Sequence, residues 1–327
     1  MVIIDELHIM GELGRGYLLE LLLTKLMYIN KKPGRTPTQI IGMSATLKNI
    51  EDLGKQLKAT VFTSNFRPVP LQEFCKIGRD IYNHHLEHVR SLPLSKTQTR
   101  DPDQITQLCA EIIAPGLSVL VFCPTQLSCN NVSTLLAELL PQVLPDYLKA
   151  SSMTLTSNSH SNFSPTSSSL SSSSSIVPSS SLVGSLTTSA PSALVDSNTL
   201  AEKRREVAQR LRVVTKGMVD PKLLESVMQG VAYHHAGVTL EERSIIETAY
   251  REGIIQVLCA TSTLAAGVNL PARRVIFRNM RVGRSDLDAV KYKQMSGRAG
   301  RAGKDSQGAL VEEVRPEVLT HYCMIIV

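Results

Sequence analysis

The sequence predicts an α/β protein with two parallel-sheet domains, the second of them interrupted by a disordered, serine-rich insertion. Short apolar runs alternate with segments of helical periodicity, which is typical of parallel sheets covered by helices. The composition changes abruptly between Ser151 and Leu200 and then returns to its former character. A length of 327 residues with 43% hydrophobic content is enough for about two domains.

Five apolar runs that end at polar or glycine-containing stretches predict the strands. They lie at Val2–Ile4, Gln39–Met43, Val119–Phe122, Val257–Leu258 and Arg274–Phe277. Helical patterns follow these runs along the chain, so the strands are expected to run parallel within their sheets.

Three segments have helical periodicity. Those from Arg15 to Ile29 and from Leu240 to Gly253 repeat apolar residues at helical spacing and are expected to pack against the sheets. The third, from Ala201 to Arg212, predicts an amphipathic helix with a basic outer face. That face is either solvated or in contact with a phosphate backbone.

The serine-rich stretch predicts an insertion without stable structure. Of the 50 residues from Ser151 to Leu200, 21 are serine, and the only formally charged one is Asp196. So few large apolar side chains cannot offset the entropy cost of ordering the chain. Residues 150–199 are therefore predicted to loop out from the surface of one domain, either as a spacer or as a phosphorylation tract.

The domain boundary is predicted at Asn65–Leu71, where two prolines in an unpatterned stretch favour an extended linker. The resulting domains cover residues 1–66 and 67–314. No fold is predicted for the tail at residues 315–327.

Charge and cysteine content exclude some classes of protein. The balance of 35 Lys+Arg against 29 Asp+Glu gives a formal charge of +6, which suits a polyanionic partner without requiring one. The six cysteines are scattered singly and form no CxxC pair, which favours buried, reduced thiols of an intracellular protein. The nearest two, Cys123 and Cys129, lack a matching His/Cys pair at ligand spacing, so packing is favoured over a zinc site. No apolar run reaches the roughly 18 residues that a membrane span needs, so no membrane partner is expected.

Two short motifs follow the first two predicted strands. Asp5 and Glu6 come directly after Val2–Ile4, which is how a nucleoside triphosphatase presents carboxylates to a magnesium ion and to the attacking water. Ser44-Ala45-Thr46 follows Gln39–Met43, where small hydroxyl side chains either sense a phosphate or form a plain turn.

Two further motifs lie in the second half. The stretch from Cys259 to Arg274 breaks from a strand into a Thr/Ser-rich turn that suits phosphate contacts, although structural turns look similar. The stretch from Tyr292 to Gly303 places Arg298 and Arg301 three residues apart, so both guanidinium groups can face one phosphate. A solvated basic loop is the alternative for this second stretch.

Taken in order, these segments resemble the motifs of superfamily-two helicases of the Ski2-like branch. "DELH" is similar to the Walker B motif, "SAT" to motif III, "VLVFCPT" to motif IV, "ATSTLAAGVNLPA" to motif V and "QMSGRAGR" to motif VI. The segments "RGYLLELLLTK", "FRPVPL", "VAYHHAGVTLEER" and "GVNLPARRVI" are most similar to the helicase domains of the polymerase-theta type and, next, of the Hel-Q repair type.

This resemblance implies two RecA-like domains, with Met1 expected to fall inside the first, which would therefore be incomplete. It implies a nucleotide site in which Asp5 holds Mg²⁺ and Glu6 polarises the attacking water. Gln294, Arg298 and Arg301 would face the triphosphate, with the two arginines as fingers. The remaining implied roles are orientation towards the nucleotide for Gly267 and Asn269, and nucleic-acid contact or coupling of hydrolysis to motion for Ser44, Thr46, Thr125 and Thr261.

Two weaker assignments accompany these roles. The stretch from Val275 to Lys291 falls where relatives carry a strand-separating hairpin, with Gly283 as its one clear turn signal. His234 and His235 are expected to have a structural or backbone-contacting role, and a metal or acid-base role is the alternative. The closing residues from Val311 to Val327 depart from the strand that relatives carry after motif VI.

The implied function is an ATP-dependent DNA helicase that uses ATP and Mg²⁺ and moves on single-stranded or forked DNA. The implied role is DNA repair in the nucleus, either in double-strand break end joining or at stalled forks. The sequence contains no G-x-x-x-x-G-K-[ST] loop to hold the β- and γ-phosphates, so the isolated chain is expected to hydrolyse little or no ATP. Two alternatives stay open: a nucleic-acid-binding remnant without catalysis, and an RNA helicase of the same branch.

Overall fold

The structure is a computed structural model that describes residues 1–11, 16–34, 36–44, 50–64, 71–157, 197–265, 268, 270–283, 285–300 and 308–313. At residues 11, 150–157, 197, 265 and 308–313 it describes the backbone alone. The predicted disordered insertion lies mostly outside these ranges, as do residues 65–70 of the predicted linker.

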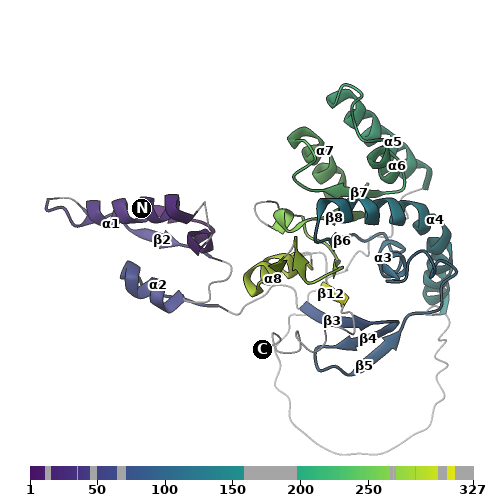
Figure 1. Cartoon of the computed structure of the whole chain (residues 1–327), viewed down its shortest axis with the longest axis horizontal. Helices are drawn as coiled ribbons and strands as arrows, with labels where there is room; N and C mark the ends of the chain where they lie inside the picture. Colours follow the sequence, from purple (N-terminus) through teal and green to yellow (C-terminus); the bar gives the residue numbers. More distant parts are fainter. Residues whose placement is uncertain are drawn as a thin grey trace, which may run out of the picture.

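The first 64 residues form a small parallel sheet with its own helices, drawn in purple in Figure 1. Strand β1 (Val2–Ile4) pairs in parallel with β2 (Ile40–Gly42), and Ile4 lies opposite Gly42. Both strands confirm the sequence prediction. The other elements of this unit are the 3-10 helix η1 (Leu7–Gly11), α1 (Gly16–Asn30) and α2 (Ile50–Leu57).

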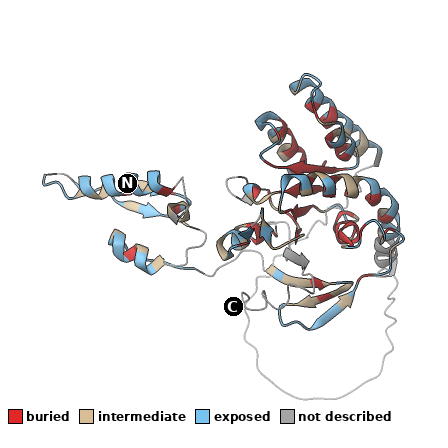
Figure 2. Cartoon of the chain, viewed as in Figure 1, coloured by how far each residue is buried: buried red, intermediate tan, exposed pale blue. Residues whose placement is uncertain are grey.

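Helix α1 covers this small sheet along one line only. Leu23 is 2% exposed and packs with Ile4 and Leu7, with Leu19 beside them. Six other apolar side chains of the helix lie outside this contact and are 36–64% exposed: Tyr17, Leu18, Leu21, Leu22, Tyr28 and Ile29. Figure 2 shows this helix mostly in the pale blue of exposed residues. The predicted packing against a sheet therefore holds for one side of α1.

The larger unit is built on an eight-stranded sheet with the order β5-β4-β3-β12-β9-β6-β8-β7. From β3 to β7 all neighbours are parallel, whereas β3, β4 and β5 form an antiparallel extension at one edge. The bounds of these strands are β3 (Leu71–Ile77), β4 (Asp80–Asn83), β5 (His88–Ser91), β6 (Val119–Phe122), β7 (Val231–His234), β8 (Val257–Ala260), β9 (Arg274–Phe277) and β12 (Gly308–Glu313).

The core of this unit lies around β6, β7, β8 and β9, whose residues are all buried. Near-continuous apolar runs are what a parallel sheet covered on both faces requires. Predictions at Val119–Phe122 and Arg274–Phe277 are confirmed residue for residue, and β8 extends the predicted Val257–Leu258 by two residues. The antiparallel extension and β7 are additions that the sequence analysis did not predict.

These strands are accompanied by α8, described below, and by α3 (Ile105–Ile113), α4 (Gln126–Ser157), α5 (Ser197–Val214), α6 (Pro221–Met228) and α7 (Leu240–Arg251). Helices α5 and α7 confirm two of the predicted helical segments. Helix α7 begins with a capping box in which Thr239 and Glu242 each bond the other's backbone amide, as the sequence pattern Thr-x-x-Glu favours. Leu136 of α4 and Leu211 of α5 belong to one hydrophobic cluster. None of the described helices is long and apolar enough to cross a membrane.

Strand β12 occupies Gly308–Glu313 and includes the first residues of the stretch from Val311 on that, by sequence, departs from the strand of relatives. It pairs in parallel with β3 on one side and with β9 on the other. A strand held by ladders on both sides is specified by its backbone, so a run of only three apolar residues before two glutamates is sufficient.

A short hairpin follows β9. Strands β10 (Arg281–Val282) and β11 (Ser285–Asp286) pair in antiparallel fashion, and Gly283 between them has a φ of 61° that favours glycine. This hairpin falls inside the predicted stretch from Val275 to Lys291. The chain then enters α8 (Ala289–Ser296), whose N-cap Asp288 accepts a hydrogen bond of 2.8 Å from the Lys291 amide.

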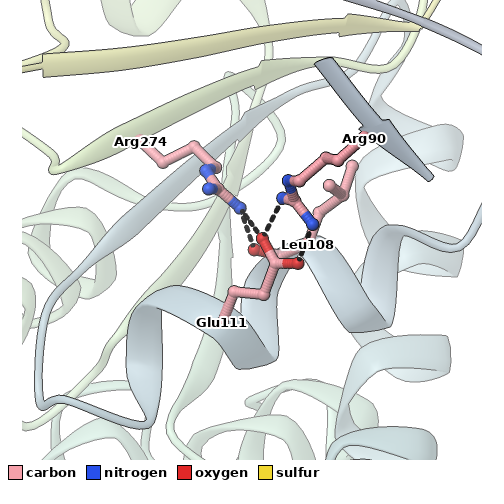
Figure 3. A network of polar contacts seen from close by, with 4 residues as sticks. All are labelled: Arg90, Leu108, Glu111 and Arg274. Carbon is pink, nitrogen blue, oxygen red and sulfur yellow. Dashed lines mark hydrogen bonds and ion pairs between the residues drawn. The ribbon is translucent and has the colours of Figure 1, made fainter. Parts of the chain in front are cut away.

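One ion-pair network ties the antiparallel extension to the parallel sheet (Figure 3). Glu111 of α3 accepts two hydrogen bonds of 2.8 Å from Arg90 of β5, in the parallel geometry that suits a guanidinium. Arg274 of β9 donates to the same carboxylate and to the Leu108 carbonyl, again at 2.8 Å. The side chains of Glu111 and Arg274 are only 15% and 11% exposed, so each charge needs the other.

Replacing Glu111 by alanine is expected to lower the free energy of unfolding by about 3–5 kcal/mol, because Arg274 would keep a buried charge without a partner. Denaturant unfolding monitored by circular dichroism measures this loss. The matched control is Glu138→Ala, which breaks a pair with Arg100 whose side chains are 47% and 58% exposed. The control is expected to cost less than about 1 kcal/mol. Equal losses in the two variants would contradict the structural role of the network.

Candidate functional site

Asp5, Glu6 and Ser44 leave the small sheet at the same edge. The Met43 amide donates to the Ile4 carbonyl at 2.8 Å, and the Leu7 amide donates to the Met43 carbonyl at 2.9 Å. These two bonds continue the parallel ladder beyond the ends of β1 and β2. The predicted carboxylate motif and the predicted serine therefore emerge side by side, as expected for the carboxyl ends of adjacent parallel strands.

The turn that carries the carboxylates is tight. Glu6 has a φ of 54°, a left-handed conformation that is uncommon for a residue with a Cβ atom, and its amide donates to Asp5 Oδ1 at 2.8 Å. Both residues are exposed to solvent. This backbone strain points the two carboxylates out of the strand and starts η1 directly behind them.

His8 is the residue that joins this edge to the larger unit. Its Nδ1 atom lies 3.3 Å from Glu6 Oε2 and 3.5 Å from Ser44 Oγ. Its Nε2 atom lies 2.6 Å from Nε2 of Gln294 in α8. The His8 side chain is only 7% exposed, so both ring nitrogens are committed to these contacts.

The partners of His8 indicate its tautomer. As the side-chain amide of Gln294 is oriented, its nitrogen donates and His8 Nε2 accepts, which leaves the ring proton on Nδ1, facing Glu6 and Ser44. The ring thereby joins groups from both units.

Arg298 lies in the turn after α8, which is fixed against the segment before β9. The Ala272 amide donates to the Arg298 carbonyl at 2.9 Å, and the Gly300 amide donates to the Ala272 carbonyl at 2.8 Å. Burial of the guanidinium lowers the pKa of Arg298, and the negative charge of Glu6 acts in the opposite direction. Glu6 and Arg298, from different units, therefore lie within electrostatic reach of each other.

Two predicted threonines lie at the carboxyl ends of the central strands of the larger sheet. Thr125 follows β6, and its hydroxyl caps α4 by accepting a hydrogen bond of 3.1 Å from the Ser128 amide. Thr261 follows β8, and its hydroxyl lies 2.9 Å from that of Thr263 in the 3-10 helix η2 (Ser262–Ala265). Each hydroxyl thus already has an intramolecular partner, and each sits at the edge where ligands bind in parallel sheets.

The structure therefore brings Glu6, Ser44 and Gln294 together around His8, with Asp5 adjacent to Glu6 and Arg298 within electrostatic reach of Glu6. Thr125 and Thr261 belong to the edge of the larger sheet. The remaining predicted residues, Thr46, Gly267, Asn269 and Arg301, lie outside the described residues. The sequence analysis quoted His8 within "DELH" but gave it no role, although its position directly after the carboxylates was a usable signal.

His234 and His235 are buried at the end of β7 and are hydrogen-bonded to protein groups. His234 Nε2 lies 2.8 Å from Glu247 Oε1, and His235 Nε2 lies 2.8 Å from Asn130 Oδ1. The His235 ring also stacks on Tyr233 with centroids 5.2 Å apart. In the described part of the chain no cluster of His, Cys, Asp or Glu could hold a metal ion. These contacts are those of structural histidines.

A cavity of about 560 Å³ opens beside His235, at the end of the sheet away from β3. Its walls come from the end of α5 and from the N-termini of α6 and α7, and they include Lys216, Asp220 and Glu242. None of the predicted site residues lines it.

Stability is expected to fall on acidification because of His234. Burial holds the pKa of this ring below its ordinary value of 6.5, although the adjacent Glu247 carboxylate opposes the shift. Below that value the unfolded chain binds a proton that the folded ring resists, so the free energy of unfolding decreases as the pH drops, by at most about 1.4 kcal/mol per pH unit for one group. Urea unfolding between pH 7.5 and 5 measures the slope.

His234→Gln is expected to flatten this pH dependence, whatever its effect at neutral pH. The control His85→Gln removes an exposed ring, and the free energy of unfolding of this variant should depend on pH as steeply as that of the parent chain. A His234→Gln variant whose stability declines with acid as steeply as the parent's would contradict the assignment.

Comparison with known proteins finds similar sequences over most of the chain. Residues 208–303 match the family described as helicase conserved C-terminal domain. The chain is 39% identical over 319 residues to the protein named Helicase POLQ-like of Caenorhabditis elegans, a match that covers 96% of this chain and 28% of that protein. It is also 39% identical over 320 residues to DNA polymerase theta of Mus musculus, which covers 94% of this chain and 11% of that protein.

A more distant similarity extends to archaea. The chain is 29% identical over 330 residues to ATP-dependent DNA helicase Hel308 of Pyrobaculum calidifontis, covering 99% of this chain and 37% of that protein. The chain thus spans between 11% and 37% of the length of these three relatives. The chain therefore carries a helicase conserved C-terminal domain and is similar over most of its length to POLQ-like and Hel308 helicases.

Proposed function

We propose that this chain contributes the water-activating carboxylate and an arginine finger to an ATP-dependent DNA helicase that moves along single-stranded DNA. The observation that carries the proposal is the meeting of the two units at His8. This ring contacts Glu6 and Ser44 on one side and Gln294 on the other, and the charge of Glu6 reaches Arg298. Hydrolysis of ATP between two such units needs a carboxylate from one and a guanidinium from the other.

The proposed roles follow from chemistry and position. Glu6 is exposed at a strand end and orients the attacking water, while Arg298 faces the charge that develops on the γ-phosphoryl group. Asp5 presents an exposed carboxylate, the hard oxygen ligand that Mg²⁺ prefers, and so fits the metal of an Mg·ATP complex. When bound, this ion neutralises charge on the β- and γ-phosphates. Gln294 joins the site through His8.

Roles for the residues outside the described ranges rest on sequence alone. Arg301 is proposed as a second finger, Gly267 and Asn269 as nucleotide-facing residues, and Thr46 as a partner of Ser44 in coupling hydrolysis to motion. A change in the nucleotide would alter the contacts of Glu6, and His8 would pass that change to α8 through Gln294.

The nucleic acid is proposed to lie along the carboxyl edge of the larger sheet, where Thr125 and Thr261 emerge. Single-stranded or forked DNA is the proposed partner, because the relatives bear the names of a DNA polymerase and of DNA helicases. By the same kinship we propose a nuclear protein of DNA repair, acting in double-strand break end joining or at stalled forks.

The polypeptide of 327 residues is expected to show little or no ATPase, since it contains no G-x-x-x-x-G-K-[ST] loop. A fusion that places a segment carrying such a loop, taken from a related helicase, ahead of Met1 is expected to hydrolyse ATP with stimulation by single-stranded DNA. In that fusion Arg298→Ala should reduce the turnover rate by about 1000-fold, the scale of an arginine finger. A coupled spectrophotometric assay measures all of these rates.

Glu6→Gln is the companion variant in the fusion. The control is Arg100→Ala, which removes an exposed arginine that pairs with Glu138 and has no proposed role, and it is expected to keep full turnover. Turnover by the 327-residue chain alone that Glu6→Gln abolishes would sink the expectation of inactivity. A fusion that is active and indifferent to Arg298→Ala would sink the finger assignment. Binding of DNA without any hydrolysis in the fusion would favour a nucleic-acid-binding function.

DNA and RNA are separated by the same assay. Stimulation of the fusion by a single-stranded DNA is expected to exceed that by an RNA of the same base sequence at equal nucleotide concentration. Contacts to a phosphate backbone do not distinguish bases, and the two oligonucleotides share one base sequence. A difference in stimulation therefore reports recognition of deoxyribose or ribose. Stronger stimulation by RNA would replace the proposal with an RNA helicase of the same branch.

A further inference from the structure

Arg278 is a cation at the carboxyl edge of the larger sheet that the preceding assignments leave without a role. It is the first residue after β9, and its amide donates to the Phe122 carbonyl at the end of β6, 3.1 Å away. The adjacent hairpin is attached to the same place, because the Gly283 amide donates to the Pro124 carbonyl at 2.9 Å. The backbone of Arg278 is therefore fixed beside Phe122, which precedes Thr125 by three residues.

The side chain of Arg278 is held by an acid from another element. Its Nη2 atom lies 3.3 Å from Oδ2 of Asp103, in the turn before α3. That turn is itself rigid, because the nearby Asp101 accepts hydrogen bonds of 3.2 and 2.8 Å from the amides of Ile105 and Thr106. The Arg278 and Asp103 side chains are 28% and 18% exposed, so the pair is partly accessible from solvent.

The charge of Arg278 reaches the ends of two neighbouring strands. A hydrogen bond from Cys129 is the main cause that lowers the pKa of the Cys123 thiol, and the positive charge of Arg278 adds to it. Burial raises the pKa of Cys259, and Arg278 opposes that shift. Cys123 directly follows β6 and Cys259 belongs to β8. The guanidinium group therefore lies near the carboxyl ends of β6, β8 and β9 together.

We propose that Arg278 binds a phosphate of single-stranded DNA at this edge, and that Asp103 is the positioning residue that aims its guanidinium group. The inference rests on the proposed function, which runs the DNA along this edge past Thr125 and Thr261. One Nη2 bond to Asp103 leaves guanidinium donors for a phosphate oxygen, and an arginine whose side chain is already oriented loses less entropy on binding.

A purely structural role fits Arg278 less well than it fits Arg274, its neighbour four residues earlier on the same strand. Arg274 is 11% exposed, donates to a main-chain carbonyl as well as to Glu111, and faces the interior of the unit. Arg278 is more exposed, contacts one carboxylate among the described residues, at 3.3 Å, and lies at the edge. The same residue type thus serves the core at one end of β9 and the edge at the other.

Fluorescence anisotropy of the full chain with a labelled 20-nucleotide oligothymidylate, over a series of salt concentrations, tests the proposal. Arg278→Gln is expected to weaken binding about tenfold at 50 mM salt and to reduce the slope of log K against log salt by about 0.7, the share of one phosphate contact on a single strand. Arg278→Lys keeps the charge and should keep the slope. Asp103→Asn should weaken binding about threefold with the slope kept, since the cation remains.

Lys55→Gln is the control, because Lys55 also pairs with a carboxylate, Asp52, but lies in α2 of the small unit, and its slope should equal that of the parent chain. An Arg278→Gln variant with the parent's slope overturns the inference and leaves the proposed function standing. A reduced salt slope in Arg278→Lys, which keeps the charge, also overturns the inference. If Arg278→Gln lowers the melting temperature, the result for Arg278→Lys decides. A parent chain that binds no oligothymidylate overturns both the inference and the proposed DNA contact.

Discussion

The pairing of β6 with β8 on one side and β9 on the other is the constraint on which the larger unit depends. Phe122 at the end of β6 lies opposite Ala260 and opposite Phe277, so the three strands finish at one level. Because the ladders are parallel, every residue that follows these ends emerges at the same edge. Thr125, Thr261 and Arg278 are brought together by this register, although up to 153 residues separate them in the sequence. A shift of one residue would exchange the side chains that β6 packs on its two covered faces, so the register is specified by packing on both sides.

The two units are joined by a different kind of interaction. Their buried residues form separate hydrophobic clusters, one around Leu23 and one around β6 to β9. The described contact between the units is polar and centres on His8 and Gln294. A polar contact costs little to exchange for water or for a ligand, whereas a shared apolar core would have to be exposed. A junction of this kind is compatible with the proposed helicase function, which requires the two units to change their relative position when a nucleotide binds.

Charged side chains inside the larger unit hold its peripheral parts in place. Glu111 connects the antiparallel extension to β9 through Arg90 and Arg274, and Asp103 attaches the turn before α3 to the end of the same strand. Both acids come from one short region of the chain. This region thereby supports β9 both in the core and at the carboxyl edge of the sheet. Substitutions in it are expected to shift residues at that edge even though the region itself contacts no ligand.

The sequence by itself determined the central strands, three helices, the carboxylate motif and the helicase kinship, because apolar periodicity and motif spacing are local properties. It could not give the order of the eight strands, the place of β12 between β3 and β9, or the antiparallel extension, since pairing partners are chosen by contacts between distant segments. Likewise, Asp5 and Glu6 were recognised from four letters, but only the tertiary structure decided that His8 bridges to Gln294, 286 residues away, and that Arg278 lies over the ends of three strands. Such contacts are fixed by packing geometry, and no window of sequence contains both partners.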